Sequence, residues 1–228
     1  MIDKKVKMHY RWTVARRLIH WTTFICIAVL TFTGFYIAHP FWFIYSPGTR
    51  EAYNTFAMAD IRFIHFIFAF IFISAIVLRL YYAFFSRYDA DWKSLLFEWF
   101  NIKEWKIVLA NYLTFKPYGV PIKSKYNPLQ SLFYFLFIIA CILQIISGLV
   151  MFTMGQNSIR GMSFMQKALY WFVSMMGGYA HVYDLHRFLT WFFIVFFIGH
   201  VYMILAHDIG DKKGTASSMI SGYEAEEK

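Results

Sequence analysis

Four long runs of apolar residues constrain the fold of this chain more than any other feature. They cover residues 20–37, 63–85, 131–154 and 188–206. A helix needs about 20 predominantly apolar residues to cross the roughly 30 Å hydrocarbon core of a bilayer. Each run is close to that length and almost free of charge, so we predict four membrane-spanning helices.

The composition of the whole chain agrees with this prediction. Of the 228 residues, 59% are hydrophobic and only 15% are charged, whereas a soluble domain carries about 25% charged residues. Intrinsic disorder, a disulfide-stapled secreted module and a water-soluble enzyme are therefore poor interpretations. The formal net charge of +9 could indicate nucleic acid. The basic residues flank the apolar runs and form no basic stripe, so we expect contact with membrane lipid and no nucleic-acid partner.

The positions of Lys and Arg predict how the spans are oriented. Basic residues are dense before the first run and between the second and third runs, and sparse after the first and third. Because cytoplasmic loops are enriched in Lys and Arg, both termini and the middle loop are expected in the cytoplasm.

Residues outside the four runs are expected to form only short elements. Residues 91–115 mix Trp, Leu and Lys at near-helical spacing, which is typical of helices lying along a membrane surface. Residues 163–176 are predicted to form a short helix on the outer side, and residues 210–228 a flexible cytoplasmic tail. We therefore predict a single all-α membrane domain over residues 1–228, a four-helix bundle with short interfacial helices.

Histidines inside the runs or next to their ends are the strongest functional candidates, because ionisable groups are costly within a membrane. His186 and His200 are 14 positions apart, so on a helix they lie on one face and about 21 Å apart along the axis. His20 lies at the depth of His200, and His65 at the depth of His186. Imidazole is a common axial ligand of haem iron, and bundle cores bring such ligands together. Two facing pairs predict two stacked b-type haems.

Other residues near these histidines could contact the haems. Gly34 follows His20 by 14 positions and would allow the first span to approach the outer macrocycle closely; Gly148 could act likewise. Ordinary packing through small residues is the alternative. Arg17 and Arg187 each lie within one turn of a proposed ligand and could pair with haem propionates, or could serve topology and lipid headgroup contact instead.

Two segments resemble a known family. Residues 17–34 read RLIHWTTFICIAVLTFTG, and residues 186–200 read HRFLTWFFIVFFIGH. They resemble the two signature segments of the b-type cytochrome subunit of membrane-bound nickel–iron hydrogenases. This group is similar to the gamma subunit of formate dehydrogenase in its four spans. The resemblance extends over residues 11–208.

The resemblance implies a fuller description of the protein. Its relatives bind two haems b; the matching ligands here are His20 with His200 on the cytoplasmic side and His65 with His186 on the periplasmic side. They sit in the bacterial inner membrane and pass electrons from the iron–sulfur small subunit and nickel–iron large subunit of hydrogenase to quinone, with menaquinone favoured. The chain would be the electron-transfer and quinone-reducing subunit of this oxidoreductase, inactive on hydrogen alone.

The resemblance also implies a quinone contact before the third run. Asn127 stands at the place where the formate dehydrogenase relatives use an Asn beside the cytoplasmic haem. Leu129 occupies the position where those relatives are expected to have Gly. A helix N-cap or turn residue before Pro128 is the other interpretation of Asn127.

Other functions remain open from the sequence. The same subunit could serve formate dehydrogenase or another periplasmic oxidoreductase. A non-redox membrane anchor or a proton-handling transporter is a more distant alternative, because neither needs four histidines paired by depth.

Overall fold

The computed structural model describes residues 7–40, 57–100, 102–113, 128–154, 160–211 and 214–226. Within these residues, four helices are long and apolar enough to cross a membrane, which confirms the prediction. They are α1 (Val14–Ala38), α2 (Ala57–Phe85), α5 (Pro128–Met154) and α7 (Tyr179–Asp211), and the apolar part of the last ends at Leu205.

Each predicted apolar run lies inside one of these helices, but every helix begins earlier than its run. The difference is largest for α7, which begins at Tyr179 where the run begins at Phe188. Backbone hydrogen bonding continues through polar residues, so a helix does not end where the hydrocarbon-compatible sequence ends. His186, which precedes the predicted run by two positions, therefore lies two turns inside a helix.

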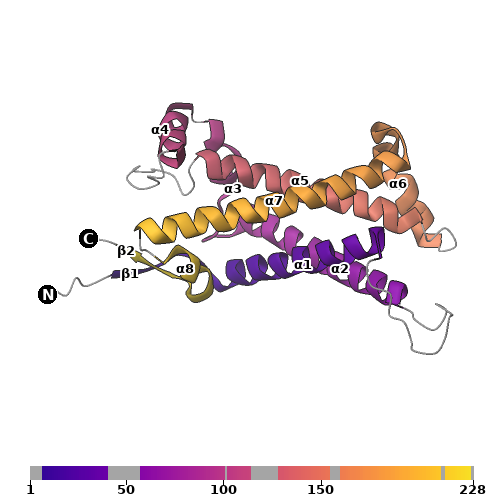
Figure 1. Cartoon of the computed structure of the whole chain (residues 1–228), viewed down its shortest axis with the longest axis horizontal. Helices are drawn as coiled ribbons and strands as arrows, with labels where there is room; N and C mark the ends of the chain where they lie inside the picture. Colours follow the sequence, from indigo (N-terminus) through magenta and orange to yellow (C-terminus); the bar gives the residue numbers. More distant parts are fainter. Residues whose placement is uncertain are drawn as a thin grey trace. The chain divides into compact units, whose positions relative to one another are not determined.

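Contacts along the chain divide it into two compact units, which we describe in turn. The first is residues 14–85, in which α1 and α2 pack along each other (Figure 1). Several of its buried residues are small or carry a hydroxyl, including Cys26 and Thr33 on α1 and Ala75 and Ala83 on α2. Small and hydroxyl-bearing residues let two apolar helices approach closely, as they do in membranes.

The second unit comprises residues 1–13 and 86–228, and α5 and α7 are its long helices. The Phe137 ring on α5 stacks on the Phe196 ring on α7, with ring centroids 4.6 Å apart. The predicted short helix is confirmed as α6 (Arg160–Met176). Two glycines with positive φ, Gly177 at 82° and Gly178 at 122°, make the turn from α6 into α7. Other residues rarely adopt these angles.

A buried apolar cluster fixes α6 against α5 and α7. It contains Val150 from α5, Phe172 and Val173 from α6, and Val182 from α7. Each of these side chains is at most 5% exposed, so the turn at the end of α6 is held by packing as well as by its glycines.

The segment predicted to hold interfacial helices is helical. It contains α3 (Trp92–Leu96), the 3-10 turn η2 (Glu98–Phe100) and α4 (Ile102–Leu113). Ser131 Oγ at the start of α5 donates to the Leu95 carbonyl at 3.3 Å, and the Trp99 and Phe135 rings lie 5.6 Å apart. These contacts attach α3 and η2 to the first turns of α5. Their position along the membrane surface stays a prediction.

The prediction of a flexible tail over residues 210–228 is wrong for the residues described there. α7 continues to Asp211, and α8 (Thr215–Ser221) and β2 (Tyr223–Glu226) follow. β2 pairs antiparallel with β1 (Lys7–Tyr10), with Tyr10 opposite Tyr223. We call β1, α8 and β2 the terminal clasp. Its order comes from partners at the other end of the chain, which a reading of local composition does not detect.

Side chains attach the terminal clasp to the rest of its unit. Trp12 Nε1 donates to Ser218 Oγ at 3.0 Å, and Arg11 forms an ion pair with Glu224. The Trp12 ring and Leu95 form a small buried cluster against which Met219 packs. The two ends of the chain are thus joined by backbone pairing, a buried hydrogen bond and apolar contact.

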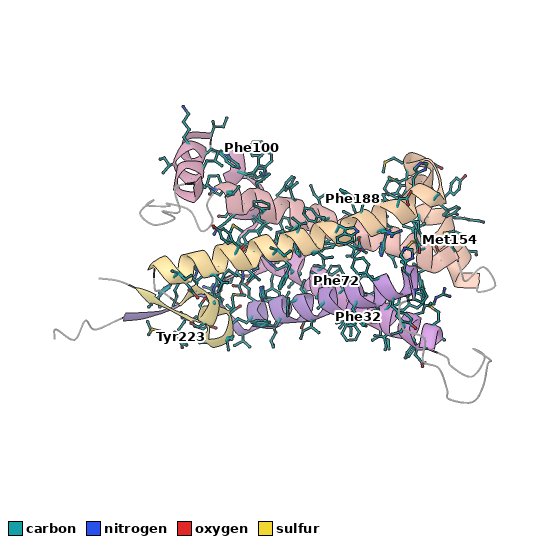
Figure 2. All side chains as sticks on the ribbon, viewed as in Figure 1. Phe32, Phe72, Phe100, Met154, Phe188 and Tyr223 are labelled. Atoms are coloured by element: carbon teal, nitrogen blue, oxygen red, sulfur yellow. The ribbon has the colours of Figure 1, made fainter. Side chains whose placement is uncertain are left out.

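Large apolar side chains also cover the outward surfaces of the long helices (Figure 2). Phe32 on α1 is 49% exposed and Phe188 on α7 is 68% exposed. Extended apolar surface of this kind is rare on proteins that face water, whereas lipid accommodates it.

Candidate haem site

His65 faces α1 from α2, and its ring is held by a hydroxyl group. Its Nδ1 lies 2.8 Å from Thr33 Oγ1, and the same hydroxyl lies 2.7 Å from the Val29 carbonyl oxygen. A carbonyl can only accept, and a hydroxyl has one hydrogen to donate. The hydroxyl therefore donates to Val29 and accepts from the Nδ1–H of His65. This leaves the Nε2 of His65 with its lone pair.

His186 is held in the same way by α5. Its Nδ1 lies 2.9 Å from Ser147 Oγ, and that hydroxyl lies 2.7 Å from the Leu143 carbonyl oxygen. The same reasoning makes Nδ1 the protonated nitrogen. Gln144 agrees with this assignment, because its side-chain nitrogen lies 3.1 Å from His186 Nε2 and can donate only to a lone pair.

A glycine follows each hydroxyl residue and lies beside the same imidazole. A Cβ on Gly34 would lie 3.6 Å from His65 Cε1, and a Cβ on Gly148 would lie 3.2 Å from His186 Cε1. We call Thr33–Gly34 and Ser147–Gly148 the two hydroxyl–glycine pairs. Each pair places a hydrogen-bond acceptor and an open stretch of helix surface against one histidine of a neighbouring helix.

The other two proposed ligands lie on α1 and α7. The His20 ring meets Trp21 edge-on, with centroids 5.3 Å apart. The His200 ring lies parallel to Phe196, with centroids 5.9 Å apart and an interplanar angle of 9°. α7 is one continuous helix from Tyr179 to Asp211, as the spacing argument for His186 and His200 requires.

Arg17 and Arg187, the predicted partners of the haem propionates, each lie close in sequence to a proposed ligand. Arg17 lies three residues before His20 on α1, and Arg187 directly follows His186 on α7; their pairing with haem propionates stays a prediction. Asn127 lies outside the described residues, and so does its predicted quinone contact. His181 is 19 positions from His200 and about 100° away from its face on a helix, which makes it a poorer ligand. It lies in the first turn of α7, with Nδ1 3.3 Å from the Gly177 carbonyl oxygen.

The sequence pattern indicated Gly34 and Gly148 but not Thr33, Ser147 or Gln144. A signal was present, because a hydroxyl residue directly precedes both of these glycines. Which histidine each hydroxyl meets depends on how the helices are rotated against each other, and the sequence does not reveal that rotation.

Comparisons with known proteins agree with the resemblance. Residues 11–222 match the family described as prokaryotic cytochrome b561. A Cupriavidus necator protein named "Probable Ni/Fe-hydrogenase B-type cytochrome subunit" is 30% identical, with 96% of this chain and 88% of that protein covered. An Escherichia coli protein named "Probable Ni/Fe-hydrogenase 1 B-type cytochrome subunit" is 29% identical, covering 96% of this chain and 92% of that protein. Four apolar helices and a family match over almost the whole chain lead to one conclusion: this is a multi-pass membrane protein that belongs to the prokaryotic cytochrome b561 family.

Proposed function

We propose that this chain is the di-haem cytochrome b subunit of a nickel–iron hydrogenase. It takes electrons from an iron–sulfur small subunit, which is bound with the nickel–iron large subunit on the periplasmic side. It delivers them to quinone, with menaquinone favoured, at the cytoplasmic side of the bacterial inner membrane. The names of the two relatives support the hydrogenase assignment.

The observation that carries the proposal is the state of His65 and His186. Iron binds an imidazole nitrogen that has its lone pair, and metal-binding histidines usually donate their other N–H to a nearby acceptor. Both rings have Nδ1 directed at a hydroxyl that is already donating elsewhere. The residues present therefore fit b-type haem, which the family implies. When bound, haem supplies a one-electron carrier within the membrane.

Depth along the spans supports the assignment of the four ligands. On continuous α7, His186 and His200 lie on one face, about 21 Å apart at 1.5 Å per residue. We assign His65 with His186 to a periplasmic haem and His20 with His200 to a cytoplasmic haem. Both assignments follow from matching depths on the spans.

Other residues of the chain would bind and orient the cofactors. Arg17 and Arg187 can offer guanidinium groups to haem propionates, which are carboxylates. Gly34 leaves room for a macrocycle beside α1, and Asn127 would contact quinone. The distribution of Lys and Arg supports cytoplasmic termini, with α3 and α4 on the cytoplasmic side and α6 on the periplasmic side.

Haem counting in ligand variants tests the proposal. We expect the chain purified in detergent to carry two haems b, as measured by pyridine haemochrome spectra per polypeptide. His65→Ala and His186→Ala should each remove the periplasmic haem, and His20→Ala and His200→Ala the cytoplasmic one. His181→Ala is the matched control and should keep both, because its ring is bonded to a carbonyl at an exposed turn.

The results that would contradict the proposal are distinct. A folded wild-type chain without haem would favour the anchor or transporter alternative. Haem that survives all four ligand substitutions would overturn the ligand assignment. Co-purification of a tagged chain from membranes distinguishes the partners: we expect the nickel–iron and iron–sulfur subunits, whereas recovery of formate dehydrogenase subunits would favour the related cytochrome.

A further inference from the structure

We propose that Thr33 and Ser147 are positioning residues for the two ligands of the periplasmic haem. Each would accept the Nδ1–H of one ligand histidine, hold Nε2 available for iron, and make the imidazole a stronger electron donor. The inference rests on the proposed function, because it concerns the ligands assigned there.

The same arrangement occurs separately in each unit of the chain. Thr33 on α1 meets His65 on α2, and Ser147 on α5 meets His186 on α7, with nitrogen–oxygen distances of 2.8 and 2.9 Å. Both hydroxyls are 2.7 Å from a carbonyl four residues earlier on their own helix. Two different helix pairs thus produce one geometry.

The hydroxyls cannot readily serve another partner. Each gives its one hydrogen to its own helix, which fixes the oxygen in place as an acceptor for imidazole. Thr33 is 3% exposed and Ser147 is fully buried, so solvent does not compete for the bond. Hydrogen bonds in such surroundings are electrostatically stronger than in water.

Helix packing alone does not explain this pattern. Ser and Thr in membrane helices commonly bond to a carbonyl one turn earlier. Ser74 does so with Phe70 at 2.9 Å, and Thr153 bonds to Val150 at 2.9 Å. Within the described residues, Thr33 and Ser147 add an imidazole nitrogen as second partner. Ser74 and Thr153 therefore serve as matched controls, one in each unit.

The hydrogen bonds have a predictable effect on the haem. An acceptor at Nδ1 raises the basicity of the coordinating nitrogen, and a stronger donor favours ferric over ferrous iron. Loss of the acceptor should raise the midpoint potential of the periplasmic haem. We expect a change of up to about tenfold in the reduction equilibrium, which is about 59 mV for one electron. Haem affinity should fall about 10- to 100-fold.

The experiment uses the full chain purified in detergent with its haems. Thr33→Val removes the hydroxyl and keeps the branched shape, and Ser147→Ala removes the second hydroxyl. Thr33→Ser retains the acceptor. Redox titration of the haem absorption and electron paramagnetic resonance of the ferric haems are measured together with haem per chain. In Thr33→Val and Ser147→Ala, we expect the midpoint potential and the paramagnetic resonance signal of one haem to shift. Thr33→Ser should have wild-type values. The control variants Ser74→Ala and Thr153→Val should show no change.

Failure of this inference is distinguishable from failure of the proposed function. Unshifted potentials and spectra in Thr33→Val and Ser147→Ala, with both haems present, would overturn the positioning role and leave the cytochrome assignment standing. If Thr33→Val loses haem and Thr33→Ser keeps it, the role of the hydroxyl is supported. If both lose haem while Ser147→Ala is unshifted, the role is overturned. A wild-type chain without haem would overturn both proposals.

Discussion

The side-chain nitrogen of Gln144 lies 3.1 Å from the Nε2 of His186, on the ring nitrogen that we assign to iron. The Oε1 atom of the same amide is buried and has no hydrogen-bond partner in the described part of the chain. Gln144 and iron would therefore compete for one lone pair.

Replacing this amide should favour haem binding. We expect Gln144→Leu to bind haem about fivefold more tightly, because one hydrogen bond worth about 1 kcal/mol no longer has to be broken. Titration of haemin into haem-free protein measures the affinity. Gln166→Leu on α6 should leave it unchanged. Weaker binding in Gln144→Leu would indicate that the amide contacts the haem itself.

The two glycines of the hydroxyl–glycine pairs should respond differently to a methyl group. A Cβ at position 34 has an ordinary contact with His65 at 3.6 Å, whereas one at position 148 meets His186 at 3.2 Å and requires the ring to shift. We expect Gly34→Ala to leave the free energy of unfolding of the haem-free chain unchanged, or to raise it by up to about 1 kcal/mol, because Ala has a higher helix propensity than Gly. Gly148→Ala should lower it.

The haem content of Gly34→Ala shows whether Gly34 contacts haem or only packs against the neighbouring helix. If α1 approaches the macrocycle there, Gly34→Ala should reduce haem per chain although the haem-free protein remains stable. Full haem content in that variant would leave Gly34 as a helix-packing residue. Thermal unfolding and pyridine haemochrome spectra on the same preparations provide both measurements.

The terminal clasp should depend on one buried hydroxyl. Ser218 is fully buried and accepts from Trp12 Nε1 at 3.0 Å, so Ser218→Ala should destabilise the clasp by about 1–3 kcal/mol. The neighbouring Ser217 is exposed, and its hydroxyl donates to the Gly214 carbonyl oxygen in its own segment. Ser217→Ala is therefore the control. Limited proteolysis should release C-terminal fragments faster from Ser218→Ala alone, and equal rates would refute the role of this bond.

Thiol labelling in cells can test the orientation of the spans. Cys26 and Cys141 are 1% and 0% exposed, so the wild-type chain should not react with a membrane-impermeant maleimide. Met175 on α6 is 64% exposed, and Ser217 on α8 is also exposed. We expect Met175→Cys to react in intact spheroplasts and Ser217→Cys only after the membrane is permeabilised. The reverse pattern would invert the topology.

The sequence alone was sufficient for the spans and for the spacing of their histidines. A membrane helix satisfies its backbone hydrogen bonds within its own segment, so about 20 apolar residues predict it without knowledge of neighbouring segments. The same local regularity places His186 and His200 on one face of α7. The helix ends were less predictable, because polar residues continue a helix beyond the apolar run.

Only the tertiary structure decided which side chains meet. Thr33 with His65 and Ser147 with His186 are separated by 32 and 39 positions, and their contact depends on the rotation of one helix against another. The terminal clasp joins residues 213 positions apart, where we expected a flexible tail. Helical periodicity identifies a face of one helix, but a hydrogen bond between helices is set by packing, which brings distant parts of the chain to within 3 Å of each other.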